Sequence, residues 1–117
     1  MEIKRLHVGP TLSEAAVFNG VVYLAGQIAE DVTQNIEGQT REVLGHVDRL
    51  LAECGSDKSR ILMCQIFLAD IKDIAAMNTV WNEWAPQGQT PPRATVQAHL
   101  ARPELLVEVV VTAAIRS

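Results

Sequence analysis

The sequence predicts an α+β fold, in which a mixed β-sheet carries two helices packed on one of its faces. Two stretches in the middle of the 117-residue chain repeat apolar residues at helical spacing. Short apolar or alternating runs, which are typical of strands, precede, separate and follow these stretches. The resulting order, β-β-β-α-β-α-β-β, contains strand–helix–strand units, which favour a sheet with its helices on one face. Residues 1–117 are expected to form a single domain.

The N-terminal part is expected to contain three short strands. The first covers residues 3–8, and two apolar runs at residues 15–18 and 21–25 form the second and third. The dipeptide Asn19-Gly20 separates these two runs. It is a strong hairpin signal, because both residue types tolerate a positive φ angle. Gly26 then breaks the third strand, and we expect backbone amide groups to be available there.

Two amphipathic stretches are the predicted helices. The first ends at Gly55, a residue type suited to a C-terminal cap. Its apolar face consists of Ile36, Thr40, Val43, Leu44, Val47, Leu50, Leu51 and Cys54. The second begins near a capping residue, Asp70. Its apolar face consists of Ile74, Met77, Val80, Trp81 and Trp84. Between the helices, residues 61–68 are expected to form a strand that turns Leu62, Cys64, Ile66 and Leu68 towards the helices.

The last third of the chain, residues 90–115, is predicted to contain two strands that pair as a hairpin. Residues 93–98 alternate polar and apolar side chains, and residues 105–114 are apolar except for one carboxylate, Glu108. A six-residue loop between them would set Thr95 opposite Glu108 and Arg93 diagonally from it on the same face. The predicted hairpin therefore brings one cation and one carboxylate together in apolar surroundings.

This predicted pair has two interpretations. A charge deep in a strand is costly unless it is paired or used, so Arg93 and Glu108 could form a structural ion pair. Alternatively, Arg93 binds a substrate carboxylate through its planar two-pronged donor edge. Glu108 would then accept a hydrogen bond from a reacting group or a water molecule.

Composition and spacing favour some classes of protein over others. The formal charge of −4 argues against a nucleic-acid-binding surface, and no apolar run approaches the roughly 18 residues of a membrane helix. The opening residues lack the apolar core of a signal peptide, so we expect a cytoplasmic protein with reduced thiols. The three histidines show no metal-ligand spacing, so no metal site is expected. The sheet face that carries Leu106 and Val110 is apolar without a helix to cover it, which predicts an oligomer interface.

Several motifs, spread over nearly the whole chain, carry a resemblance to a known family. Residues 91–96, Pro-Pro-Arg-Ala-Thr-Val, are followed by Val-Glu-Val at 107–109, and the acid lies fifteen residues after the arginine. Residues 25–28, Ala-Gly-Gln-Ile, are similar to a Ser-Gly-Gln segment, and Asn78 falls where that family keeps an asparagine. Together these motifs resemble the reactive intermediate deaminase (RidA, YjgF-type) family. The paired Trp81 and Trp84 look most like its YoaB-like branch.

The resemblance implies a chorismate-mutase-like fold, assembled as a homotrimer with clefts between subunits. It also implies the hydrolysis of enamines or 2-imino acids to 2-oxo acids and ammonia. Arg93 and Glu108 would be the catalytic residues, with Arg93 binding the substrate carboxylate and Glu108 positioning the attacking water. Thr95, Asn78 and Gly26 would complete substrate binding. No cofactor is implied, because such a substrate is already electrophilic.

The chain departs from the family's deaminating branch at two positions. That branch has a tyrosine shortly after a Gly-Pro step, whereas Gly9-Pro10 is followed here by Thr-Leu-Ser. The serine before Gly-Gln is replaced by Ala25. A second class of function therefore stays open, that of a non-catalytic trimer that binds small carboxylates such as 2-oxo acids, as a sensor or chaperone-like module. A ribonuclease role has been proposed for some relatives, but the acidic charge gives it little support.

Overall fold

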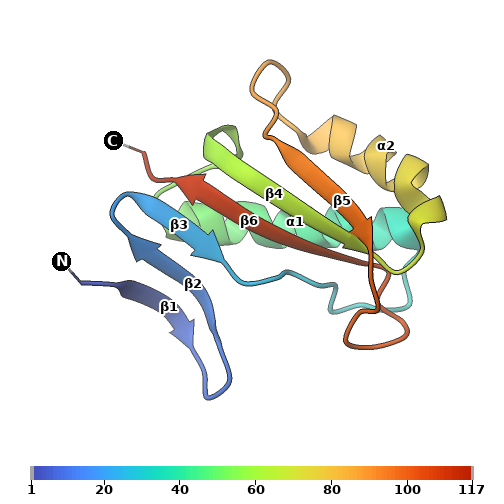
Figure 1. Ribbon diagram of the computed structural model, residues 1–117, viewed down its shortest axis with the longest axis horizontal. Coiled ribbons are helices and arrows are strands. Elements are labelled where there is room, and N and C mark those ends of the chain that lie inside the picture. Colours follow the sequence, from blue (N-terminus) through green and yellow to red (C-terminus); the bar gives the residue numbers. More distant parts are fainter. Residues whose placement is uncertain (1, 117) are drawn as a thin grey trace.

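The computed structural model describes residues 2–116, which fold into one six-stranded sheet and two helices (Figure 1). The strands are β1 (Lys4–Val8), β2 (Ser13–Phe18), β3 (Val21–Leu24), β4 (Ile61–Leu68), β5 (Arg93–Gln97) and β6 (Val107–Ala114). The helices are α1 (Ile36–Glu53) and α2 (Ile74–Trp84), and short 3-10 turns cover Lys58–Arg60 and Ile71–Asp73. The predicted order of strands and helices is confirmed.

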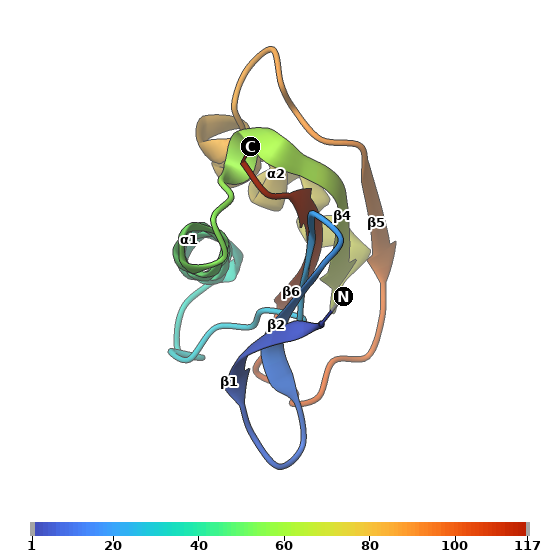
Figure 2. The ribbon, with the colours of Figure 1, turned by 90° about the vertical axis from the view of Figure 1, so that its left-hand side faces the viewer.

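The strands lie in the order β1-β2-β3-β6-β4-β5. The pair β4 and β5 is parallel and is joined by α2, while the other neighbouring strands are antiparallel. Both helices lie on the same side of the sheet (Figure 2). The predicted mixed sheet with two helices on one face is therefore confirmed.

Local sequence explains the turn between β2 and β3 and the ends of α1. Asn19 and Gly20 both have positive φ angles, 54° and 79°, as a tight hairpin turn requires. The side chain of Asn35 accepts a hydrogen bond from the backbone N–H of Gly38 at 2.9 Å and so caps the N-terminus of α1. Gly55, with a φ angle of 78°, follows the C-terminus of this helix.

The core lies between the helices and one face of the sheet. The predicted apolar face of α1 is buried throughout, from Ile36 to Cys54. It meets alternate residues of β6, namely Val107, Val109, Val111 and Ala113, each at most 1% exposed. In α2, Met77, Val80 and Trp81 are buried against the same core. Aliphatic side chains thus supply most of the core, as expected for a chain with 4% aromatic residues.

The predicted hairpin of β5 with β6 is wrong, because β4 lies between these two strands. Cys64 of β4 pairs with Arg93 on one side and with Val111 on the other. The β4–α2–β5 segment is a parallel crossover unit, and such a unit places its second strand beside the first. The strand β6 then pairs with the free edge of β4.

This topology also separates the two predicted catalytic side chains. Arg93 is level with Cys64 and Val111, which are buried against the helices, so Arg93 lies on the helix side of the sheet. Glu108 is level with Phe67, on the opposite side. Among residues 2–116, no ion pair joins Arg93 to Glu108. The predicted contact between them within one chain is therefore wrong.

One further residue of β4 differs from the prediction. Cys64, Ile66 and Leu68 face the helices as expected, but Leu62 is 50% exposed. The register of β4 against β6 shifts between Ile61 and Met63, and this irregularity turns Ile61 inward in its place.

The second face of the sheet carries no helix (Figure 2). Four large side chains on it are markedly exposed, namely Phe18, Tyr23, Met63 and Val96, at 39 to 51% of their surface. Val110 lies among them and is half-buried. Within residues 2–116 an uncovered face that carries Val110 is confirmed, whereas Leu106, which was expected on the same face, packs against the buried core.

Candidate functional site

The edge strand β5 and helix α2 hold an arginine against an aromatic ring. The guanidinium carbon of Arg93 lies 5.0 Å from the centre of the Trp81 ring, a distance at which a cation is attracted to the ring face. Trp81 is only 5% exposed, and its ring centre is 5.3 Å from that of Trp84. Packing therefore fixes the ring on which Arg93 rests. Among residues 2–116 Arg93 makes no ion pair, so its donor edge can bind an anion.

Two buried polar atoms without partners belong to the same two elements. Within residues 2–116, Oδ1 of Asn78 and Oγ1 of Thr95 are buried and have no hydrogen-bond partner. Asn78 lies three residues before Trp81 on α2, and Thr95 lies two residues after Arg93 on β5. These spacings put each polar residue on the same side of its element as the neighbouring member of the Arg93–Trp81 contact. An unpartnered buried polar atom costs about 1–3 kcal/mol, so both atoms point to a missing partner.

A buried cysteine lies beside this cluster. Cys64 is level with Arg93 in the sheet and is fully buried. Burial raises the pKa of the Cys64 thiol to about 12, and the positive charge of Arg93 opposes this shift. The thiol therefore stays protonated at neutral pH. It is a small apolar residue under the arginine and not a nucleophile.

Glu108 lies on the opposite face and rests against Gly26. A Cβ atom added to Gly26 would collide with Oε2 of Glu108 and would lie 2.9 Å from its Cδ. Only glycine gives the carboxylate this space. Among residues 2–116 Glu108 makes no ion pair, so its oxygens can accept hydrogen bonds from a ligand or a water molecule.

The segment that carries Gly26 is fixed to β6 by the backbone. The N–H of Gln27 donates to the carbonyl of Val109 at 2.8 Å, and the N–H of Val109 donates back at 3.1 Å. The Gln27 side chain, 5% exposed, donates to the carbonyl of Ala25 at 2.9 Å. These bonds hold the backbone of Gly26 beside that of Glu108.

Gln39 is a supporting residue that sequence reasoning missed. It is fully buried in α1, and its Nε2 donates to the carbonyls of Gln34 and Glu104 at 3.1 and 3.0 Å. Its Oε1 accepts a hydrogen bond from the backbone N–H of Leu106 at 2.9 Å. Gln39 thereby fixes the segment that leads into β6 and Glu108. A glutamine inside the apolar repeat of the first helix was the available signal.

Of the five predicted site residues, the structure groups three on one side of the sheet and two on the other. Arg93, Thr95 and Asn78 lie between β5 and α2, whereas Glu108 and Gly26 lie on the uncovered face. Two surface hollows of about 280 and 150 Å³ are lined by neither Arg93 nor Glu108. We call the first group the arginine cluster and the second the glutamate cluster. Within one chain the two clusters are separated by the sheet.

Residues 2–116 contain neither a metal-binding cluster nor a membrane-spanning helix. No group of three or more His, Cys, Asp or Glu side chains is arranged to hold a metal ion within this range. Neither helix of the same range is long and apolar enough to cross a membrane.

The fold is that of a known class of small α+β proteins. A YjgF family member from Neisseria meningitidis superimposes with a TM-score of 0.97, is 45% identical, and the match covers 100% of this chain and 98% of the other. A protein from Pseudomonas aeruginosa superimposes with a TM-score of 0.95 at 40% identity, over 98% of this chain and 100% of the other. The fold is therefore that of the YjgF-type class.

The family model described as Endoribonuclease L-PSP matches residues 3–115. The chain therefore belongs to this family, and the resemblance to the RidA and YjgF type is confirmed. It is 49% identical over 114 residues to a RutC family protein of Haemophilus influenzae, which covers 97% of this chain and 98% of the relative. It is 38% identical over 115 residues to the RutC family protein YoaB of Escherichia coli, which covers 98% and 100%.

Proposed function

We propose that the protein hydrolyses 2-imino acids, and their enamine tautomers, to 2-oxo acids and ammonia. The observation that carries this proposal is the arginine cluster, in which Arg93 rests on Trp81 beside the unpartnered atoms of Asn78 and Thr95. A planar guanidinium suits a carboxylate, and two buried polar atoms suit the adjacent polar groups of a small acid. Membership of the RidA and YjgF type supports this class of substrate.

The proposed reaction requires a group that binds the substrate carboxylate and a general base that accepts a proton from water. Water adds to the imine carbon while Glu108 accepts one of its protons, and the imine nitrogen is protonated. The resulting carbinolamine breaks its C–N bond, releases ammonia and leaves the carbonyl of the 2-oxo acid. Arg93 would hold the substrate carboxylate throughout. No redox step occurs, because one water is consumed for each ammonia released.

The two clusters would meet between copies of the chain. They lie on opposite sides of the sheet in one copy, so a shared site needs the arginine cluster of one copy and the glutamate cluster of a neighbour. The apolar face beside Glu108 is the surface through which copies would associate. We propose a homotrimer, in which each of three equivalent interfaces carries one site.

A second candidate function is the binding of small carboxylates without hydrolysis. It is favoured by Ala25, which stands where the deaminating relatives have a serine, and by an arginine cluster that is complete without Glu108. The word endoribonuclease in the family description suggests a third activity. The formal charge of −4 does not favour a surface for the phosphate backbone of RNA.

The proposal is tested by measuring ammonia release from 2-iminobutanoate generated in the assay by an amino-acid oxidase. Arg93→Lys keeps the charge but loses the planar fork. It should lower kcat/KM by about 30- to 1000-fold, which corresponds to about 2–4 kcal/mol. Glu108→Gln should lower kcat with less effect on KM, because the acid acts on the water and not on the carboxylate. Arg60→Gln, at an exposed arginine outside both clusters, is the matched control and should retain full activity.

The same variants separate the candidate functions. If the protein only binds carboxylates, ammonia release will equal the uncatalysed rate, and 2-oxobutanoate will bind the parent but not Arg93→Lys. Incubation with single-stranded RNA should leave the RNA intact. An Arg93→Ala protein that turned over imino acid at the parent rate would remove Arg93 from the proposed mechanism.

A further inference from the structure

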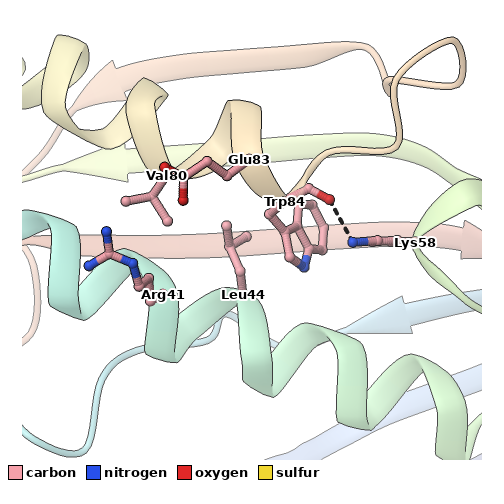
Figure 3. Close-up of a pocket in the computed structure, with 6 residues that line it drawn as sticks. All are labelled: Arg41, Leu44, Lys58, Val80, Glu83 and Trp84. Atoms are coloured by element: carbon pink, nitrogen blue, oxygen red, sulfur yellow. Dashed lines mark hydrogen bonds between the residues drawn. The ribbon is translucent and has the colours of Figure 1, made fainter.

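A cavity that the proposed reaction does not use lies between α1 and α2, in front of the sheet (Figure 3). Its volume is about 280 Å³, just below the usual range of about 300–1,000 Å³ for ligand pockets. Its lining residues are Arg41, Leu44, Lys58, Val80, Glu83 and Trp84. We call it the interhelical pocket. It lies on the helix side of the molecule, away from the uncovered sheet face through which copies would associate.

The floor and one wall of the interhelical pocket are apolar and held in place. Leu44 and Val80 line the floor and are 1% and 3% exposed, so core packing fixes them and each presents only a small part of its side chain to the pocket. The wall is the Trp84 ring, whose Nε1 donates to Oδ2 of Asp48 at 2.9 Å. Lys58 donates to the carbonyl of Trp84 at 2.6 Å, and its Nζ lies 5.2 Å from the centre of the Trp84 ring. The indole is thus held by its N–H and by the nearby Lys58 cation, and the pocket wall is preorganised for an apolar group.

One end of the interhelical pocket presents two opposite charges. Arg41 of α1 and Glu83 of α2 lie at the same end, across the pocket from each other and beside Val80 (Figure 3). Among residues 2–116 neither side chain takes part in an ion pair. A direct bond between two such exposed side chains would contribute little, so a ligand that offers both charges can displace it.

We propose that the interhelical pocket binds a free α-amino acid with an apolar side chain. Its carboxylate would bind the guanidinium of Arg41, and its ammonium would bind the carboxylate of Glu83. These ligand groups are attached to the same carbon, which matches two protein charges at one end of the pocket. The apolar side chain would lie over Leu44 and Val80 towards Trp84. A simple carboxylate would leave Glu83 without a partner, and a simple amine would leave Arg41 without one.

Nuclear magnetic resonance of the tryptophan indole N–H groups tests this proposal directly. The chain has two tryptophans, so two such signals are expected, and a Trp84→Phe variant identifies the signal from the pocket. Addition of L-leucine should shift the Trp84 signal in a saturable way, with a Kd on the order of 1 mM or tighter. N-acetyl-L-leucine and L-leucinamide each lack one charge. Both should bind at least about tenfold more weakly.

Variants of the two charged residues complete the test. Arg41→Gln and Glu83→Gln remove one charge each from exposed helix positions, and each should weaken L-leucine binding about tenfold or more. Arg60→Gln, which does not line the pocket, should bind as the parent does. The proposal is overturned if L-leucine gives no saturable shift, or if either pocket variant binds it as tightly as the parent. Ammonia release from imino acid is a separate measurement, so this result and that of the proposed reaction can be told apart.

Discussion

A single absent side chain gives Glu108 its position. Gly26 has no Cβ atom, and the Glu108 carboxylate occupies the space in which that atom would lie. The backbone bonds of Gln27 with Val109 keep the two residues in register. In the proposed reaction, water activation therefore depends on a glycine that makes no contact with substrate through a side chain.

The first prediction is that Gly26→Ala impairs turnover more than stability. The added Cβ atom forces the end of the Glu108 side chain to move, and a displacement of about 1 Å can lower kcat by roughly 100-fold. The measurements are ammonia release and thermal unfolding. Gly45→Ala is the control, because a Cβ atom at this exposed helix position meets nothing within 4 Å. It should keep activity and raise the free energy of unfolding by about 0.5–1 kcal/mol. Full activity in Gly26→Ala would contradict the prediction that catalysis depends on the position of the Glu108 carboxylate.

The second prediction concerns pH and Glu42. Its carboxylate accepts hydrogen bonds from the backbone N–H groups of Glu30 and Asp31 at 2.6 and 3.3 Å, and His46 lies 2.9 Å away. The Glu30 hydrogen bond contributes most to holding the pKa of Glu42 below its ordinary value of 4.5. Because the folded-state pKa is depressed, this stabilisation is complete above pH 4.5 and is lost as the pH falls through the folded-state pKa.

Urea unfolding of the parent and of Glu42→Gln, from neutral pH down to pH values below 4.5, checks this expectation. The parent should lose more stability over that interval than the variant. An equal loss in both proteins would mean that other carboxylates cause the acid sensitivity.

At the scale of elements, α1 fixes the start of β6 through Gln39. The third prediction is that Gln39→Ala destabilises the protein by about 2–5 kcal/mol, since it removes a fully buried side chain and leaves the backbone groups of Glu104 and Leu106 without these partners. Chemical denaturation measures the loss. Gln87→Ala is the control, because Gln87 is exposed and its side-chain bonds are to nearby carbonyls. A loss below about 1 kcal/mol for Gln39→Ala would contradict a role in fixing this segment.

The identity of the elements could be predicted from sequence, but their lateral order could not. Helical spacing marked the buried face of α1, and Asn19-Gly20 marked the first hairpin, because these signals are local. An alternating pattern shows which residues of a strand share a face, but it does not show which strand lies beside it. The pairing of β5 with β4 followed from the crossover helix between them. The prediction joined β5 to β6 by proximity in sequence and so put Arg93 on the wrong face.

The residues of the candidate site could be predicted from the sequence, but their positions relative to one another in the fold could not. Arg93 and Glu108 stood out because each is a charge in a strand. Trp81 was assigned to the apolar face of its helix, and its contact with Arg93 depends on how α2 crosses β5. The space that Gly26 leaves for Glu108 depends on an isolated bridge between residues far apart in the chain. Local patterns carry no information on such contacts.

At the scale of the whole molecule, the sheet face that no helix covers is the feature that predicts how copies of the chain associate. The fourth prediction is that the protein is a trimer at micromolar concentration, and that Val110→Asp dissociates it, because a carboxylate would lose its hydration in an apolar interface. Size-exclusion chromatography with light scattering measures the mass. Ala75→Asp, at an exposed position of α2 on the helix side, should remain trimeric. A monomeric parent protein would refute both the trimer and a site shared between copies.

The central place of β6 in the sheet has a consequence for biosynthesis. This strand joins the β1–β2–β3 part of the sheet to the β4–β5 part, yet it is the last of the six strands in residues 2–116 to leave the ribosome. Until Val107–Ala114 has emerged, the two parts have no common neighbour, and the facing edges of β3 and β4 lack the strand that pairs with both. The sheet therefore stays incomplete until β6 has emerged. A product truncated before this strand would leave the edges of β3 and β4 open and would have a strong tendency to aggregate.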